Sequence, residues 1–353
     1  NDNGMLMYAS KNISFDGVYE ANPLTGQQMN LFGSAAGVDV TGKMGALPTR
    51  NFSGKFAEGW EVLSSPKWRE RMVAQGGRGG IPCQPGCIVR CSNEYFDKNG
   101  NYLTAGTEYE TLGLCGPNID IYDQEEIMHI DRLCDDMGYD TIEIGTALGV
   151  AMECGVIEWG DAEAAKDLIR HSLDEDSKLP SLRNGCHAVG EALGAKRVPT
   201  AKKQAVAAYD PRVILGYGLC FERSPMGGDH TSGSAFTFRK DLTPDQQADM
   251  ALAQTAVCDS FMCLFPWSAV YYNPDARAAI CRMAGILAGK PEGPGMNLVE
   301  EMGDEILRLE RKFNEREGLT EDDNRLPDFF YTEAAEATGV PFTSPFGKQP
   351  KGE

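Results

Sequence analysis

Three cysteines within nine residues constrain the fold of this chain more than any other feature. Cys83, Cys87 and Cys91 frame the segment Cys-Gln-Pro-Gly-Cys-Ile-Val-Arg-Cys. Pro lacks a backbone N–H donor and Gly adopts dihedral angles that other residues avoid, so the segment favours a loop over a helix or strand. A cubane iron–sulfur cluster needs four thiolates and commonly takes three of them from one such loop. The segment therefore predicts a [4Fe-4S] cluster that needs one further cysteine.

Two alternatives to a cluster remain open, namely zinc and a loop of free or buried thiols. Zinc sites commonly use short C-x2-C pairs, whereas this loop has wider spacing and no second pair accompanies it. The spacing favours a cluster but does not identify the fourth ligand. The candidates are Cys115, Cys134, Cys154, Cys186, Cys220, Cys258, Cys263 and Cys281.

Composition limits the partners and the compartment. The 353 residues carry a net charge of −19, from 33 basic and 52 acidic side chains. This charge argues against binding to nucleic acid or to an anionic membrane surface. Eleven irregularly spaced cysteines, with no apolar run of about 18 residues and no signal peptide, predict a cytoplasmic protein without a membrane span. The first residue is Asn rather than Met, so we expect a fragment, a processed product or one piece of a larger protein.

The pattern of apolar residues predicts a mostly α fold with little β structure. Asp123 and Asp140 are expected N-caps, and Asn99-Gly100 marks a hairpin. The apolar residues of the last helix, from Leu298 to Phe313, recur at helical spacing and form one stripe. Helices are predicted over residues 60–75, 124–137, 141–153, 162–173, 185–193, 244–258, 274–288 and 297–317.

Three regions are expected along the chain. Residues 1–60 are rich in Gly and Asn and predict an irregular connecting segment. Residues 61–210 form one helical domain that carries the cysteine loop, and residues 211–353 form a second helical domain with a C-terminal tail. The boundary between the two packed helical domains is expected between residues 200 and 215.

Two short segments present candidate catalytic groups. Glu108 and Glu110 flank Tyr109, and a buried carboxylate has a raised pKa that suits a general acid or base. A pair of surface carboxylates is the alternative. His230 lies in the Gly-rich turn 227–233, which is typical of a loop that presents a functional imidazole, although a turn histidine without a role is the other interpretation.

Polar residues in or beside the helices predicted over residues 124–137 and 141–153 have two interpretations each. Asp135 and Asp140 flank the turn between two helices, where they either cap helix ends or accept hydrogen bonds from an NH-rich heterocycle. Glu126 and His129 share one helical face and could form half of a metal site across a two-fold axis, or a solvated pair.

Taken together, these features resemble the aldehyde ferredoxin oxidoreductase family of tungsten enzymes. The resemblance covers about residues 45 to 330 and rests on eight motifs in the same order. The motifs are Leu47-Pro-Thr-Arg-Asn-Phe52, the cysteine loop with Cys91-Ser-Asn93, Glu108-Tyr-Glu-Thr111, Asp135-x-x-Gly-x-Asp140-Thr-Ile142, Tyr209-Asp-Pro-Arg212, Gly228-Asp-His230, Asp259-Ser-x-x-Cys263-x-Phe265 and Arg311-x-Phe-Asn314-x-x-x-Gly318.

The resemblance implies a role for each candidate residue. Cys263 is implied as the fourth cluster ligand, and Glu110 and His230 match the pair beside the metal. One pterin is implied to contact Asp135 and Asp140, and the second pterin to contact Asp259 and Met262. Glu126 and His129 lie near the position of a metal that some members bind at the dimer axis, so a homodimer is one expectation.

This sequence departs from the family pattern in three places. The cysteine loop is C-x3-C-x3-C where the common family loop is C-x2-C-x3-C, and we expect it still to hold a cubane. The motif from Asp259 to Cys263 is one residue shorter than usual, which puts the role of Asp259 in doubt. The β-rich N-terminal domain that supports the pterins is absent from this chain, which resembles the two C-terminal helical domains alone.

The function implied by the resemblance is oxidation of a small aldehyde to a carboxylic acid. Tungsten, or molybdenum, held by two pterins would supply the redox chemistry, and electrons would pass through the [4Fe-4S] cluster to ferredoxin or an iron–sulfur subunit. A related tungsten enzyme that reduces another carbonyl or thioester substrate in a larger complex is the first alternative. The second alternative is a non-catalytic iron–sulfur subunit that transfers electrons.

Overall fold

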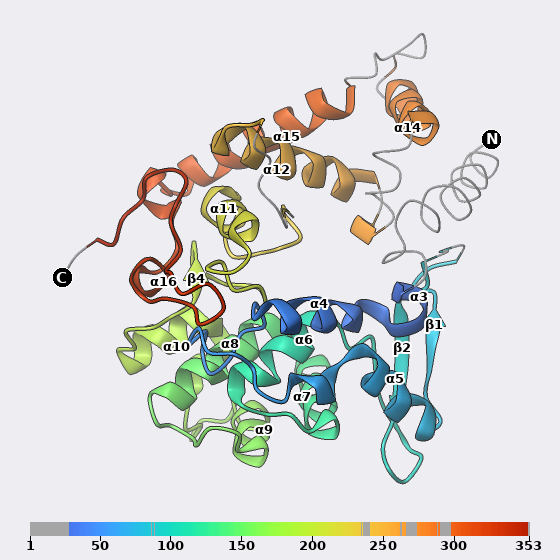
Figure 1. Ribbon diagram of the computed structural model, residues 1–353, viewed down its shortest axis with the longest axis vertical. Helices are drawn as coiled ribbons and strands as arrows, with labels where there is room; N and C mark the ends of the chain where they lie inside the picture. The colour runs from blue at the N-terminus through green and yellow to red at the C-terminus, as the bar shows by residue number, and fades with distance from the viewer. Residues whose placement is uncertain are drawn as a thin grey trace.

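Helices dominate the chain, which confirms the predicted mostly α fold. A computed structural model describes residues 28–351, except residues 86, 88, 234, 236–240, 262, 266–273, 288 and 290–297. Figure 1 shows two groups of helices, with the C-terminal segment running between them. None of the described helices is both long and apolar enough to cross a bilayer. The domain boundaries at residues 60 and 210 stay a prediction.

The first group of helices matches the predicted ranges closely. Asp123 and Asp140 accept hydrogen bonds from the backbone N–H groups of the first turn of their helices, so both predicted N-caps are confirmed. The elements of this group are α3 (Met29–Phe32), η3 (Gly33–Ala35), α4 (Ala36–Met44), η4 (Trp60–Leu63), α5 (Ser65–Ala74), α6 (Tyr109–Leu114), η5 (Pro117–Ile119), α7 (Gln124–Met137), α8 (Thr141–Glu153), α9 (Ala162–Arg170), η6 (Pro180–Asn184) and α10 (Gly185–Leu193).

The expectation that residues 1–60 are irregular is wrong for α3, η3 and α4. Ala35 and Val38 are fully buried, so the helical segment belongs to the core. Asp39 Oδ2 accepts a hydrogen bond from the Ser65 backbone N–H at 3.2 Å, which joins α4 to the start of α5. Packing against distant residues therefore stabilises this segment, and its local sequence carries little sign of that packing.

A small antiparallel sheet holds the cysteine loop. Strands β1 (Arg78–Ile81), β2 (Ser92–Phe96) and β3 (Tyr102–Ala105) pair in the order β1-β2-β3. The predicted hairpin is confirmed between β2 and β3, whereas β1, which includes Gly79 and Gly80, was not predicted. The cysteine loop leaves β1 and returns as β2, so the sheet fixes both ends of the loop.

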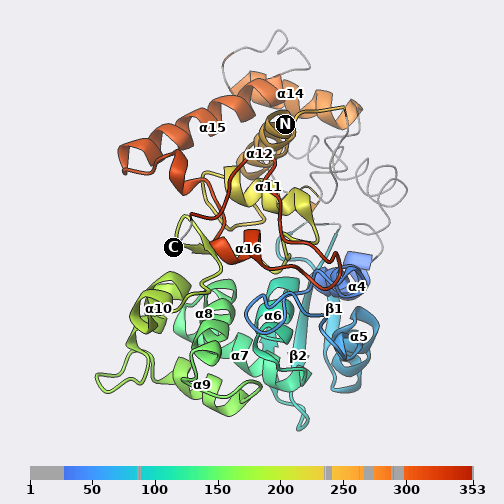
Figure 2. The ribbon, with the colours of Figure 1, turned by 60° about the vertical axis from the view of Figure 1, so that its left-hand side comes forward.

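The second group of helices packs through a face that differs from the predicted one. Helix α12 lies beside α15 in both ribbon views (Figure 2). Leu307 of α15 is buried in this contact, whereas Leu309 and Phe313 of the predicted apolar stripe are 52% and 62% exposed. The elements are β4 (Thr200–Ala201), β5 (Gln204–Ala205), α11 (Leu215–Arg223), α12 (Pro244–Phe261), α14 (Pro274–Leu287), α15 (Leu298–Arg316), η7 (Glu321–Asp323) and α16 (Asp328–Thr332).

Three consecutive left-handed residues form the turn at the end of the Leu47–Phe52 motif. Arg50, Asn51 and Phe52 have φ angles of 41°, 52° and 54°. Such a conformation costs roughly 1–2 kcal/mol per residue, so its surroundings must hold it. Asn118 does this, because its backbone carbonyl accepts from the Asn51 N–H at 3.0 Å and its Oδ1 accepts from the Phe52 N–H at 3.2 Å.

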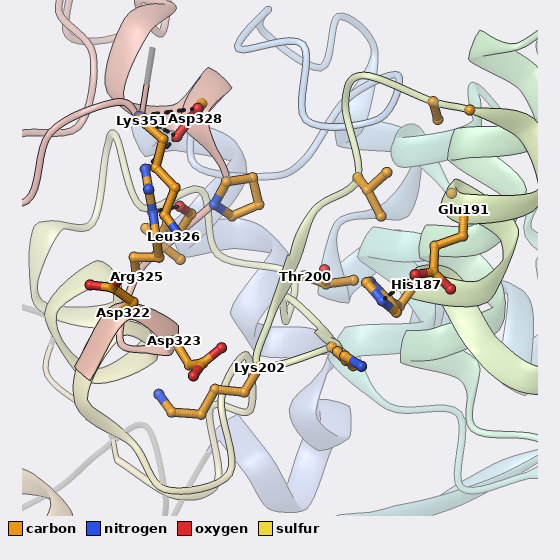
Figure 3. A pocket seen from close by; sticks show the side chains of 16 residues that line it. His187, Glu191, Thr200, Lys202, Asp322, Asp323, Arg325, Leu326, Asp328 and Lys351 are labelled. Carbon is orange, nitrogen blue, oxygen red and sulfur yellow. Dashed lines mark hydrogen bonds and ion pairs between the residues drawn. The ribbon is translucent and has the colours of Figure 1, made fainter. Parts of the chain in front are cut away.

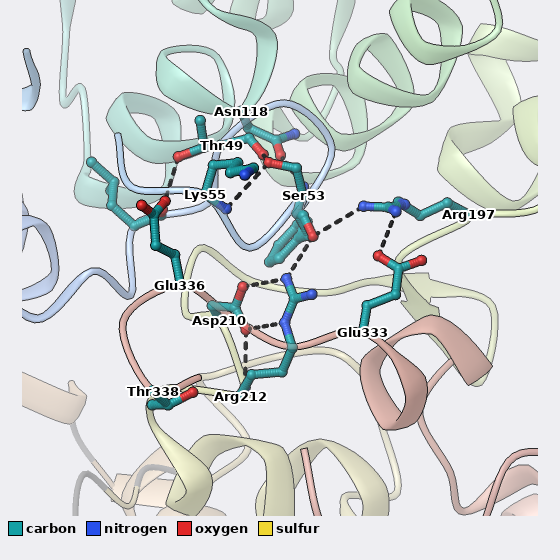
Figure 4. Close-up of polar contacts among 12 residues, drawn as sticks. Thr49, Ser53, Lys55, Asn118, Arg197, Asp210, Arg212, Glu333, Glu336 and Thr338 are labelled. Atoms are coloured by element: carbon teal, nitrogen blue, oxygen red, sulfur yellow. Dashed lines mark hydrogen bonds and ion pairs between the residues drawn. The ribbon is translucent and has the colours of Figure 1, made fainter. Parts of the chain in front are cut away.

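Two arginines converge on the backbone carbonyl of this turn (Figure 4). Arg212 is fully buried, its Nη2 lies 2.6 Å from Asp210 Oδ2, and the same Nη2 donates to the Phe52 carbonyl oxygen at 2.5 Å. Arg197 Nη1 donates to that carbonyl at 3.4 Å, while its Nη2 pairs with Glu333 Oε2 at 2.5 Å. These contacts join the strained turn to the Tyr209–Arg212 motif and to the C-terminal segment.

A buried carboxylate fastens the C-terminal segment to α11. Glu222 is fully buried, and its Oε1 accepts from the Tyr331 hydroxyl at 2.6 Å while its Oε2 accepts from Ser344 Oγ at 2.9 Å. Burial raises the pKa of Glu222 to about 7. The Tyr331 hydroxyl also accepts from the Leu326 N–H at 2.8 Å. The Glu222 carboxylate thus anchors the C-terminal segment at two points, Tyr331 and Ser344.

We expect Asp210→Asn to destabilise the protein strongly. The substitution leaves the charge of Arg212 buried without its partner, which typically lowers the free energy of unfolding by about 3–5 kcal/mol. Urea denaturation measures this change. The control is Glu305→Gln, which breaks the exposed Glu305–Arg308 pair and should leave the unfolding curve unchanged. Equal midpoints for the two variants would contradict the structural role of the buried pair.

Stability should depend on pH through Glu222. Its folded pKa of about 7 lies above the value of about 4.3 for an unfolded glutamate. Its contribution to stability is therefore fully present below about pH 4 and is lost as the pH rises through about 7. Between about pH 5 and pH 8, the melting temperature of Glu222→Gln should fall less than that of the unmodified protein. Calorimetry tests this, with the exposed Glu175→Gln as a control that keeps the full pH dependence; an equal fall in all three proteins would refute it.

Candidate functional site

The two candidate catalytic residues lie next to each other, although they are far apart in sequence. Glu110 lies in the first turn of α6, and its Oε1 is 3.4 Å from Nε2 of His230. Only 6% of Glu110 and 20% of the His230 side chain are exposed. The other carboxylate oxygen, Oε2, accepts from the Ala208 backbone N–H at 2.6 Å. The carboxylate is therefore fixed at one oxygen and faces the imidazole with the other.

Burial shifts the pKa of Glu110, and two buried atoms of the Glu110–His230 pair make no hydrogen bond within the described residues. Burial raises the pKa of Glu110, while the nearby His230 and the Ala208 N–H lower it by a smaller amount. Within the described part of the chain, Glu110 Oε1 and His230 Nδ1 are buried and make no hydrogen bond. Buried polar atoms are normally satisfied. These two atoms therefore fit a site whose remaining partner is a substrate, a water molecule or a cofactor.

The turn that carries His230 is built to hold one conformation. Asp229 precedes His230, and its Oδ2 accepts from Ser232 Oγ at 2.8 Å. On the other side of the turn, a Cβ atom at Gly228 would lie 2.5 Å from the Ala205 carbonyl oxygen, so only glycine allows this approach. The turn therefore packs directly on the β4–β5 hairpin, and the hairpin positions the imidazole.

Three tyrosines pack around the pair, and analysis of the sequence alone gave them no role there. The ring of Tyr209 lies 5.5 Å from the His230 ring, 4.1 Å from the stacked Tyr217 ring and 4.9 Å from the Tyr109 ring, measured between centroids. Burial raises the pKa of Tyr209 well above its usual value, so its phenol stays neutral. The motif Tyr209-Asp-Pro-Arg212 was the only sequence sign of this aromatic wall.

The four predicted cluster ligands share one electrostatic environment. Cys83 is exposed and Cys87 and Cys91 are half-buried in the loop between β1 and β2, while the exposed Cys263 follows α12. Burial raises the pKa of Cys91 to about 12, and the charge of Glu108 and then those of Cys263, Cys87 and Cys83 add to the shift. The charges of the three other thiols all raise the pKa of Cys91.

The four thiols have the donor set of an iron–sulfur cluster, and the cluster stays a prediction. Among the residues that the structure describes, no three metal-binding side chains lie close enough to hold one metal ion. In a cubane, each thiolate binds a different iron at a separate corner, so the thiolates lie farther apart than the ligands of one zinc ion. Four cysteines without an added carboxylate or imidazole form the donor set of such a cluster.

The predicted pterin contacts are only partly described. Asp140 uses Oδ1 to cap α8, where it accepts from the Ile142 N–H at 2.6 Å, and its charge also acts on Glu110. Asp135 is exposed in the last turn of α7. The backbone of Asp259 belongs to α12, but its side chain and the whole of Met262 lie outside the described residues. All four contacts stay predictions.

Glu126 and His129 have partners within this chain. Glu126 Oε2 lies 2.5 Å from Nζ of Lys166 on α9, and the same Nζ lies 2.6 Å from Glu163 Oε1. His129 Nε2 is 4.0 Å from Oε1 of Glu125. The charge of Glu126 is therefore balanced by Lys166, and the metal site at a dimer axis stays a prediction.

A separate hollow lies between α10, the β4–β5 hairpin and the C-terminal segment (Figure 3). Its volume is about 650 Å³, and none of the predicted site residues lines it. Lys202 borders it with Nζ 3.2 Å from the Glu222 carbonyl oxygen, and burial lowers the pKa of Lys202 to about 8. The candidate site built on Glu110 and His230 therefore does not include this hollow.

Comparison with known proteins places these features in one family. A family model described as "Aldehyde ferredoxin oxidoreductase, domains 2 & 3" matches residues 12–344. The tungsten-containing aldehyde ferredoxin oxidoreductase of Pyrococcus furiosus is 28% identical over 226 residues, which cover 59% of this chain and 36% of that protein. Its counterpart in Pyrococcus abyssi is 29% identical over 228 residues, covering 59% of this chain and 36% of the relative.

A relative with a different name matches at lower identity. The "Aliphatic sulfonate oxidoreductase, WOR-like subunit" of Pyrococcus furiosus is 25% identical over 229 residues, covering 57% of this chain and 35% of that protein. The chain thus spans about a third of the length of the curated relatives it matches. Because the family model matches nearly the whole chain, this protein belongs to the aldehyde ferredoxin oxidoreductase family and corresponds to its domains 2 and 3.

Proposed function

We propose that this chain forms part of a tungsten (or molybdenum) bis-pterin oxidoreductase that converts an aldehyde into a carboxylic acid. The observation that carries the proposal is the buried Glu110–His230 pair, which leaves Glu110 Oε1 and His230 Nδ1 without hydrogen-bond partners among the described residues. The names of the tungsten-containing relatives support the metal and the substrate class. A pterin-binding domain outside this chain would complete the site.

The reaction assigns a role to each residue of the pair. An aldehyde and water give a carboxylic acid, two protons and two electrons, and the metal–pterin group supplies the two-electron redox chemistry. Glu110 accepts a proton at Oε1 from the water that adds to the carbonyl carbon, and burial favours this role because it raises the pKa of the carboxylate. His230 donates a hydrogen bond to the carbonyl oxygen and stabilises the negative charge that develops there.

The cysteines provide the exit for electrons. In this proposal Cys83, Cys87, Cys91 and Cys263 hold a [4Fe-4S] cluster, which carries one electron at a time. The two electrons therefore leave in sequence to ferredoxin or to an iron–sulfur subunit. The electrostatic coupling of Cys91 to the other three thiols supports a shared cluster.

A second candidate function keeps the cofactors and changes the substrate. In this alternative the chain belongs to a larger complex that reduces another carbonyl or thioester substrate, and the word "subunit" in the name of one relative supports the larger complex. Product analysis with aldehydes and thioesters separates the two reactions. A protein that contains iron but neither tungsten nor molybdenum would instead support the non-catalytic electron carrier.

Glu110→Gln should lower kcat for aldehyde oxidation by about 10² or more, because it removes the proton acceptor. The acid limb of the pH–rate profile should also disappear in this variant. Steady-state kinetics on preparations with matched metal content measure both effects, and the exposed Glu175→Gln serves as the control with unchanged kcat. A loss of less than about tenfold would remove Glu110 from the role of base.

Removal of the cluster should change which cysteines react with an alkylating reagent. In the anaerobic native protein, we expect the four proposed ligands Cys83, Cys87, Cys91 and Cys263 to be protected, because iron blocks each sulfur. After oxidation and chelation of iron, all four should label in peptide mapping by mass spectrometry. The exposed Cys154 is the internal control, which labels in both states, while the six buried cysteines label in neither. Full labelling of Cys83 and Cys263 in the native protein would exclude the cluster.

A further inference from the structure

Glu108 is joined both to the cysteine loop and to the proposed catalytic pair. Toward the loop, its side chain bonds Ser34, and the neighbouring Gly33 packs against the Cys91 carbonyl oxygen. In the other direction, Glu110 and His230 are among the charges that act on Glu108. The function proposed above gives this half-buried carboxylate no role.

Ser34 holds the Glu108 side chain in place. Ser34 Oγ donates a hydrogen bond to Glu108 Oε2 and accepts one from the Tyr109 backbone N–H at 2.8 Å. The backbone carbonyl of Glu108 accepts from the Leu112 N–H at 3.2 Å, which begins α6. The carboxylate is therefore attached at its side chain and its backbone, and it shares its anchor with the residue that precedes Glu110.

The same anchor lies directly against the cysteine loop. A Cβ atom at Gly33 would lie 2.7 Å from the Cys91 carbonyl oxygen and 3.0 Å from Nδ2 of Asn93, and Gly33 has a φ of 65°. Only glycine permits this approach. Because Ser34 follows Gly33 in η3, the contact fixes the position of Glu108 relative to the loop that ends at Cys91.

No cation neutralises Glu108 within the described part of the chain. No lysine or arginine forms an ion pair with it there. Burial raises the pKa of Glu108, and the hydrogen bond from Ser34 opposes that shift. The charges of Asp131 and Glu110 also raise its pKa, and that of His230 lowers it. A negative charge in a partly buried site acts strongly over short distances, because little water screens it.

We infer that Glu108, held by Ser34, lowers the reduction potential of the iron–sulfur cluster through its charge. The inference rests on the proposed function, because it requires the cluster. Reduction adds one electron to a cluster that four thiolates already make anionic, and a fixed carboxylate nearby disfavours that electron. Glu108 thereby keeps the reduced cluster a strong enough reductant to pass its electron to a low-potential acceptor.

The test is a redox titration of the assembled protein, followed by electron paramagnetic resonance of the reduced cluster. Glu108→Gln should shift the reduction potential in the positive direction, since it removes the charge and keeps the size of the side chain. Glu108→Asp keeps the charge and should stay near the unmodified value. Glu315→Gln, which removes an exposed carboxylate on α15, is the control for net charge and should leave the potential unchanged.

The possible results separate the inference about Glu108 from the proposed function. An unchanged potential in Glu108→Gln, with the cluster spectrum intact, overturns the inference and leaves the proposed function standing. The absence of any cluster signal in the unmodified protein overturns both. Should Glu108→Gln fail to fold, Glu108→Ala replaces it: it also removes the charge, so a positive shift supports the inference and an unchanged potential refutes it.

Discussion

The backbone of Ala208 is the point on which the site depends. Its N–H donates to Glu110 Oε2 and its carbonyl accepts from the Tyr109 hydroxyl. Two consecutive residues of α6 are therefore bound to one residue that lies far away in the sequence. The segment around Ala208 continues from the hairpin that supports the His230 turn. The buried carboxylate and the imidazole therefore meet because the backbone of one residue joins α6 to the segment that supports the His230 turn.

Buried charge extends this junction into the rest of the molecule. Arg212 lies four residues beyond Ala208. Its guanidinium donates hydrogen bonds to the Phe52 carbonyl oxygen and to the Asp210 carboxylate. The strained turn that ends at Phe52 is held by Asn118 of η5, whose Nδ2 also donates to the Gly145 carbonyl oxygen of α8 at 3.3 Å. A site that depends on a few short contacts needs such a rigid support, because a shift of about 1 Å can remove catalytic activity.

The sequence predicted those parts of the fold whose signals are local. Residues 124–137 and 185–193 were predicted to the residue, because caps and apolar spacing mark a helix directly. Helix α4 and the face of α15 that packs on α12 were missed, because distant partners determine both. In the site, the cysteine loop was evident from spacing, whereas the fourth ligand and the meeting of Glu110 with His230 came only from the resemblance. The tyrosine wall around His230 was marked only by the Tyr209-Asp-Pro-Arg212 motif, because its rings come from distant parts of the chain.

The central claim is that this chain holds an iron–sulfur cluster beside a tungsten or molybdenum site. Metal analysis of the native assembly, with a gel that identifies every chain present, tests it most directly. The account predicts about four iron atoms per chain, as a single cubane requires, together with about one tungsten or molybdenum and a polypeptide that supplies the pterin-binding domain. Zinc in place of iron, or iron without tungsten or molybdenum, would contradict it.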